Sequence, residues 1–215
     1  MFVLRALGEL LMTMGIVVLL FAAYELWGTG LVTDREQGRL VEALEQAWRE
    51  PVRRPGSTEP DPVPVEAGSG VAVMRVPAFG ADWSKVVVEG TGREELKKGP
   101  GRMAGTADFG AVGNTVVSGH RTTYGAPFVD LDRLVPGDAV LVETQEAILV
   151  YRMYGSEVVR PTDVAVALPV PRRPGATPTK SLLTLTTCNP KYSARERLIV
   201  YAELSETRPK QPASG

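Results

Sequence analysis

The chain has very little cysteine and histidine: its 215 residues include one of each, Cys188 and His120. A single cysteine cannot form an intramolecular disulfide, so the fold must be stable without one. The net formal charge of −1 gives no basis for the positive surface that nucleic-acid binding requires. One histidine and one cysteine are too few for the three or four protein ligands of a zinc site, and no acidic cluster suggests calcium. We therefore expect no metal, no other cofactor and no nucleic-acid partner.

One long apolar run lies near the N-terminus. Residues 10–27 read LLMTMGIVVLLFAAYELW and contain one charge, Glu25. A helix needs about 20 mostly apolar residues to cross a bilayer, and the segment 9–31 meets that length. Tyr24 and Trp27 lie where aromatic residues gather at a membrane surface. The run therefore predicts a transmembrane helix at 9–31.

A cleaved signal peptide is the alternative to this anchor. Its apolar region is usually shorter, about 7–15 residues, and ends in a small-x-small cleavage site. The bulky residues after Ala22-Ala23 make a poor site, which favours the anchor. Positive charges next to the run are too few to set its orientation. A short cytoplasmic leader at 1–8 and a large following domain favour a single-pass protein with its N-terminus inside and its domain outside the cell.

Residues 32–70 connect the span to the rest of the chain. Apolar residues recur at helical spacing over 40–48, with charged residues between them, which predicts an amphipathic helix. It is either a stalk without a partner or a helix that lies on the membrane or the domain. The segment 51–70 is rich in proline, glycine and charge and predicts an extended tether.

From residue 71 the pattern changes to short β-branched runs separated by turns. The expected strands are 71–76, 85–88, 115–118, 139–143, 147–159, 182–187 and 198–203. Only brief helices fit, at 93–98 and 128–134. Many short strands at this spacing predict an all-β domain over 71–206, either a closed barrel or a sandwich. Residues 207–215 are expected to form a disordered tail.

Cys188 is a candidate nucleophile. It ends the strand-like run 182–187, and Asn189-Pro190 stops that run, so the thiol lies at an element end where it can be reached. Arg195 and Arg197 follow closely, and nearby cations favour the reactive thiolate. The competing interpretation is a small buried apolar side chain, which is the commonest role of a lone cysteine.

His120 and an arginine are candidate partners of this thiol. His120 ends the strand-like run 114–119, and such a histidine can be purely structural, but beside a cysteine it is the usual proton carrier. Arg197 begins the last strand and could stabilise a developing oxyanion, or could be a solvated charge. Arg195 has the same strand parity, so spacing does not separate these two arginines.

Three separated motifs resemble the sortases, the cysteine transpeptidases of Gram-positive cell surfaces. They are TLTTC at 184–188, SGHR at 118–121 and RLIV at 197–200, and they occur in the sortase order over about 71–206. The segments HRTTYG at 120–125 and CNPKYS at 188–193 are most similar to class E, the housekeeping group of actinobacteria. The resemblance implies a closed eight-stranded β-barrel with short helices, preceded by a transmembrane helix.

The resemblance also implies a reaction and roles for individual residues. Cys188 is the nucleophile, His120 the general acid and base, and Arg197, rather than Arg195, the oxyanion stabiliser. The protein is expected to cleave a C-terminal sorting signal, either LAxTG-like or LPxTG, between Thr and Gly. It then transfers the substrate protein from a thioacyl intermediate to an amine of a peptidoglycan precursor.

Two further residues and two alternatives complete the interpretation. The resemblance implies that Tyr124 accommodates the alanine of the signal, although it could instead pack the loop after His120. Thr187 lies beside the nucleophile and is expected to touch the substrate. The alternative functions are a cell-surface thiol hydrolase that uses the same Cys-His pair, and a non-enzymatic tethered β-barrel module.

Overall fold

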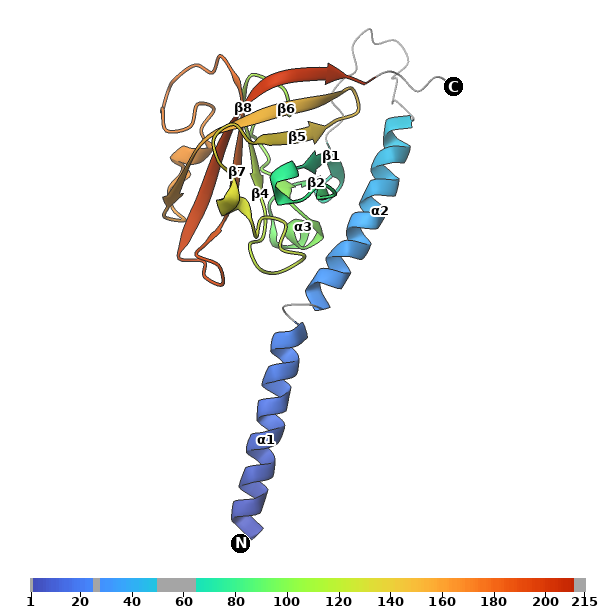
Figure 1. Ribbon diagram of the computed structural model, residues 1–215, viewed down its shortest axis with the longest axis vertical. Coiled ribbons are helices and arrows are strands. Elements are labelled where there is room, and N and C mark those ends of the chain that lie inside the picture. The colour runs from blue at the N-terminus through green and yellow to red at the C-terminus, as the bar shows by residue number, and fades with distance from the viewer. Residues whose placement is uncertain (1, 25–27, 50–64, 211–215) are drawn as a thin grey trace.

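This computed structural model describes residues 2–24, 28–49 and 65–210, and it contains two N-terminal helices and one β-barrel (Figure 1). Helix α1 (Phe2–Ala23) is long and apolar enough to cross a membrane and is unburied along its length. It begins inside the segment expected to be the leader. Helix α2 (Thr29–Arg49) includes the amphipathic segment expected at 40–48. Most of the proline-rich tether, residues 51–64, and positions 25–27 of the expected span lie outside the described residues.

Eight strands close into a barrel. They are β1 (Gly70–Arg75), β2 (Ser84–Glu89), β3 (Gly101–Arg102), β4 (Gly113–Ser118), β5 (Ala139–Glu143), β6 (Ala147–Val159), β7 (Ser181–Asn189) and β8 (Glu196–Pro209). Their order around the barrel is β1-β2-β3-β4-β7-β8-β6-β5, and β5 pairs with β1 to close it. The expected all-β, closed eight-stranded barrel is confirmed. The pairs β4–β7 and β2–β3 are parallel, and the other pairs are antiparallel.

The short helices connect the strands. They are α3 (Arg93–Lys98) and the 3-10 turns η2 (Pro77–Phe79), η3 (Leu131–Arg133) and η4 (Val164–Ala167). Helix α3 coincides with the expected segment 93–98, and its charges suit the helix dipole: glutamates lie in its first turn and lysines in its last. In the segment 128–134, where a helix was expected, only the 3-10 turn η3 forms.

Side chains of β7 and β8 alternate between the barrel interior and its outer surface. The interior core includes Leu183, Leu185, Leu198 and Val200. A second apolar cluster is formed outside the barrel by Val159, Val166, Ile199 and Tyr201. Asn114 holds the β6–β7 connection over this surface, because its amide donates to the carbonyl oxygens of Val166 (3.3 Å) and Leu168 (3.0 Å). The β6–β7 connection therefore forms a wall beside the outer surface of β7.

Helix α2 lies against β1, β2 and α3 (Figure 1). The Gln37 side chain is buried there and makes three hydrogen bonds to main-chain groups. It donates to the carbonyl oxygens of Val86 (3.1 Å) and Lys98 (2.8 Å) and accepts from the Val86 amide (2.7 Å). Thr33 donates to the carbonyl oxygen of Lys97 at 2.8 Å. The helix predicted as a stalk or a packed element is thus packed on the barrel.

Candidate active site

Cys188 and Arg197 lie directly opposite each other on the antiparallel strands β7 and β8. Residues opposite each other in such a pair project from the same face of the sheet. Ile199, two residues after Arg197, belongs to the outer apolar cluster, so this face is the outside of the barrel. The sulfur and the guanidinium therefore emerge on the surface that the β6–β7 connection walls.

His120 reaches the same surface from the other side of β7. Strand β4 runs parallel to β7, and their last register pair is Ser118 with Thr186. His120 follows this last pair by two residues on one chain segment, as Cys188 does on the other. The Gly119 amide extends the contact by donating to the carbonyl oxygen of Thr186 at 3.0 Å. Three distant sequence motifs thus meet at the ends of three neighbouring strands.

These three side chains line one open cavity of about 370 Å³. Its lining includes His120, Cys188 and Arg197, the side of β4 and β7, and the β6–β7 connection with η4. A second hollow of about 350 Å³ is lined by His120, Arg121, Thr122, Thr123, Cys188, Tyr192, Ser193 and Ala194. His120 and Cys188 line both, so two separate surfaces lead to the same pair.

The His120 imidazole is partly shielded from water. Burial lowers its pKa below the ordinary value, because the charged form loses hydration. Nδ1 lies 3.4 Å from the Thr123 hydroxyl. The Tyr124 ring packs on the imidazole, with 4.9 Å between centroids and planes tilted by 39°. The neutral imidazole, which can accept a proton, is therefore the favoured form near neutral pH.

Tyr124 and Thr187 differ in their relation to the cavities. Tyr124 contacts the His120 ring but is not among the lining residues of either cavity described above. Its backbone is held in the left-handed region, with φ of 51°, and its amide donates to the Thr29 hydroxyl of α2 at 3.3 Å. Thr187 lines the larger cavity, and its buried hydroxyl donates to the Gly119 carbonyl oxygen at 2.7 Å.

The two candidate arginines occupy different positions. Arg197 is half-buried, lines the larger cavity and donates through Nη1 to the carbonyl oxygens of Ala194 (3.0 Å) and Glu196 (2.9 Å). Arg195 precedes β8 and is exposed. Register thus puts Arg197, and not Arg195, opposite the thiol.

Within residues 2–24, 28–49 and 65–210, no group of three or more His, Cys, Asp or Glu side chains could hold a metal ion.

The site has two parts that the sequence did not predict. One is the wall formed by Val164, Val166 and their neighbours, which lies in a connection without periodicity. The other is Arg121, which belongs to the motifs at 118–121 and 120–125 but was given no role there.

The residues 74–205 match the family model described as the Sortase domain. The chain belongs to the sortase family. It is 34% identical over 96% of its length to sortase SrtE1 of Streptomyces coelicolor, and it spans 58% of that protein.

Solved sortase structures agree with this assignment. Sortase E of Streptomyces avermitilis is 44% identical, with a TM-score of 0.61 over 69% of this chain and 97% of that one. Sortase E1 of Streptomyces coelicolor, solved with a tripeptide in the active site, is 35% identical, with a TM-score of 0.61 over 68% and 96% of the two chains. The expected resemblance to class E is confirmed.

Proposed function

We propose that the protein is a membrane-anchored sortase with Cys188 as nucleophile, His120 as general acid and base and Arg197 as oxyanion stabiliser. Family membership supports a cysteine transpeptidase reaction. The observation that carries the proposal is the meeting of the three side chains at one open cavity on the outside of the barrel. The roles follow from the chemistry of each group, since these are a nucleophile, a proton carrier and a fixed hydrogen-bond donor.

The first half of the reaction cleaves the sorting signal. The neutral His120 imidazole takes the thiol proton, and the Cys188 sulfur attacks the carbonyl carbon of the Thr–Gly bond. The carbonyl oxygen becomes negative, and Arg197 on the opposite strand donates hydrogen bonds to it. The imidazolium returns the proton to the glycine nitrogen, the C–N bond breaks, and a thioester to Cys188 remains.

The second half transfers the acyl group to an amine. The amine nitrogen attacks the thioester carbon, His120 takes a proton from that nitrogen, and the C–S bond breaks to release the thiolate. The imidazolium then returns this proton to the sulfur, which restores the thiol and the neutral imidazole. We propose that the larger cavity holds the signal and that the hollow beyond Cys188 admits the amine. Two approaches to one sulfur suit a ping-pong sequence, because the acceptor can enter while the acyl chain stays bound.

The proposed substrates are surface proteins with an LAxTG-like or LPxTG C-terminal signal, and the proposed acceptor is an amine of a peptidoglycan precursor. The tripeptide in the active site of sortase E1 supports a peptide-binding cavity at this position. We propose that Thr187 and Tyr124 contact the signal. The packing of Tyr124 on the His120 ring supports a position beside the reacting bond. Tyr124→Ala should change the ratio of kcat/KM values for the two signals.

We propose that α1 anchors the protein in the membrane, with the N-terminus inside and the barrel outside the cell. The apolar character and exposure of α1 support the anchor. The single thiol gives a direct test of the orientation. A membrane-impermeant maleimide should label Cys188 in intact cells, and Cys188→Ala supplies the blank. Labelling that requires cell lysis would contradict the proposed orientation.

Peptide cleavage by the full-length protein in detergent tests the reaction. LAxTG and LPxTG peptides should be cut between Thr and Gly, a thioester adduct should appear on Cys188 by mass spectrometry, and Cys188→Ala should abolish both. When an amine such as a glycine peptide is added, it should be joined to the threonine of the cleaved signal through an amide bond. Acid as the main product at saturating amine would favour the hydrolase, and unchanged cleavage by Cys188→Ala would overturn the proposal.

A further inference from the structure

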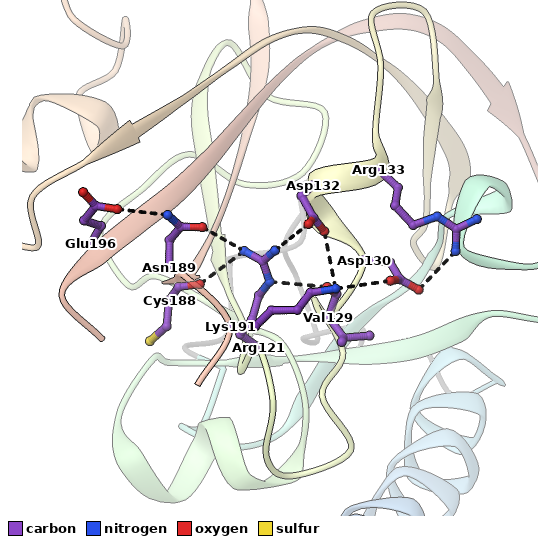
Figure 2. A network of polar contacts seen from close by, with 9 residues as sticks. All are labelled: Arg121, Val129, Asp130, Asp132, Arg133, Cys188, Asn189, Lys191 and Glu196. Atoms are coloured by element: carbon purple, nitrogen blue, oxygen red, sulfur yellow. Dashed lines mark hydrogen bonds and ion pairs between the residues drawn. The ribbon is translucent and has the colours of Figure 1, made fainter. Parts of the chain in front are cut away.

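Arg121 is a buried charge immediately after the proposed proton carrier. Its side chain is 3% exposed. A guanidinium cannot lose its charge in a protein, so burying it is costly unless its N–H groups are paired. The contacts that compensate for this burial show which parts of the chain Arg121 joins (Figure 2).

On one side, the guanidinium binds the main chain of the proposed nucleophile. Nη1 donates to the carbonyl oxygen of Cys188 at 3.3 Å and to Oδ1 of Asn189 at 3.4 Å. Asn189 in turn donates through Nδ2 to Glu196 of β8 at 3.0 Å. Figure 2 shows the Cys188 carbonyl directed at Arg121 and the sulfur on the other side of the residue. The contact thus holds the backbone of Cys188 and leaves its thiol open.

On the other side, the guanidinium binds η3 and the loop that precedes it. Nε donates to the carbonyl oxygen of Val129 at 3.3 Å, and Nη2 lies 3.0 Å from Oδ2 of Asp132. Lys191, just beyond the end of β7, lies 3.8 Å from Asp130 and 3.9 Å from Asp132. The same loop is therefore tied to the end of β7 by two cations.

These contacts occur where the strand pairing stops. The β4–β7 ladder ends at Ser118 and Thr186, with one further main-chain bond from Gly119. Beyond that point the two segments are joined by hydrogen bonds from side chains. The Thr187 hydroxyl donates to the Gly119 carbonyl oxygen, and the Arg121 guanidinium donates to the Cys188 carbonyl oxygen. His120 and Cys188 line both cavities in this same region, where these side-chain links take the place of strand pairing.

We propose that Arg121 is a positioning residue of the reaction. Its guanidinium fixes the backbone of Cys188 relative to that of His120, so that sulfur and imidazole keep their spacing through both half-reactions. The inference rests on the proposed roles of these two residues. Arg121 borders the smaller hollow, but its side chain is 3% exposed and the contacts above already engage its guanidinium, so Arg121 acts through the main chain and not on the substrate. A loss of alignment of about 1 Å can cost on the order of 100-fold in rate.

The test compares Arg121→Met and Arg121→Lys with Arg133→Met in the full-length protein in detergent. Arg133 is a matched control: it lies on the same loop and pairs with Asp130, but its side chain is 63% exposed. For each protein, kcat and KM for the sorting-signal peptide are measured, and the reactive thiol is counted by alkylation. Arg121→Met should lower kcat per reactive thiol by about tenfold or more, with KM within about twofold, and Arg121→Lys should recover part of the loss. Arg133→Met should match the wild type.

The inference is overturned if Arg121→Met has the kcat per reactive thiol of Arg133→Met, since its effect is then on folding alone. If Arg121→Met does not fold, Asn189→Ala replaces it, because this change removes one contact of Arg121 on β7, together with the bond from Asn189 to Glu196, and keeps the Asp132 ion pair. It should lower kcat per reactive thiol by about threefold, less than Arg121→Met, because Arg121 keeps its bond to the Cys188 carbonyl oxygen, and no change would overturn the inference. Failure of the wild type to cleave any signal peptide would instead refute the proposed function.

Discussion

The buried amide of Gln37 gives a quantitative prediction about how α2 is held to the barrel. Gln37→Ala removes one acceptor and two donor contacts and leaves the Val86 amide and two carbonyl oxygens without their partner. We expect α2 to detach locally more often, while the barrel stays folded. Gln46→Ala is the matched control, because Gln46 lies on the same helix and is exposed.

The size of the effect follows from the groups left unpaired. Each buried polar group that loses its partner costs about 1–3 kcal/mol. The total is smaller here, because water can enter the partly opened interface between α2 and the barrel and bind these groups. We therefore expect about 2 kcal/mol of lost docking free energy in total, which is roughly a 30-fold rise in the opening equilibrium. An isolated helix of this length is only marginally stable, so amides of the detached α2 should exchange with solvent.

Hydrogen exchange followed by mass spectrometry measures this opening. Peptides from the middle of α2 should exchange roughly 30-fold faster in Gln37→Ala than in Gln46→Ala, and peptides from β7 should be unchanged in both. Equal exchange of α2 in the two variants would refute the reasoning, since the three hydrogen bonds would then contribute nothing to docking. Faster exchange of β7 as well would show that α2 supports the whole barrel.

Three further predictions concern the site. The one histidine, His120, should titrate by NMR below about 6.5, because burial lowers its pKa. The unfolded chain then binds the proton more readily, so the free energy of unfolding should fall as pH drops below about 6.5, and His120→Gln should lack this component. Arg197→Lys should lower kcat by about 100-fold, whereas Arg195→Lys should not, as steady-state kinetics will show; equal losses would contradict the strand register as the cause. Thr187→Val should destabilise the protein by about 1 kcal/mol in thermal unfolding, because it leaves the Gly119 carbonyl oxygen without its donor; an unchanged transition would refute this.

Much of the barrel is predictable because its strands are half-buried or fully buried. The segments 139–143 and 147–159 coincide with β5 and β6, since β-branched and aromatic residues mark them. Strand β3 was missed because Gly101–Arg102 has two residues and therefore no alternation. The expected end of the last strand at 203 is wrong: β8 continues to Pro209, where exposed polar residues pair with β6 and show no apolar pattern.

The residues that meet at the candidate site can be predicted from the sequence, but the segments that form the sides of the cavity cannot. Cys188 and His120 are unique in the chain, and family motifs gave them partners. The larger cavity, in contrast, depends on the β6–β7 connection, which Asn114 holds in place through main-chain acceptors. A carbonyl oxygen has no signature in sequence, so this contact could not be foreseen. The same holds for Arg121, whose acceptors include the main chain of Cys188.

The hydrogen bond from the Tyr124 amide to Thr29 has a practical consequence for anyone who shortens this protein. A fragment that begins after residue 64 lacks Thr29, which holds Tyr124, a residue with positive φ, against the His120 imidazole. The kcat of such a fragment would therefore be measured with the loop after His120 no longer held by α2. Kinetic comparisons between variants should therefore retain the first 49 residues, even when the lipid environment itself is replaced by detergent.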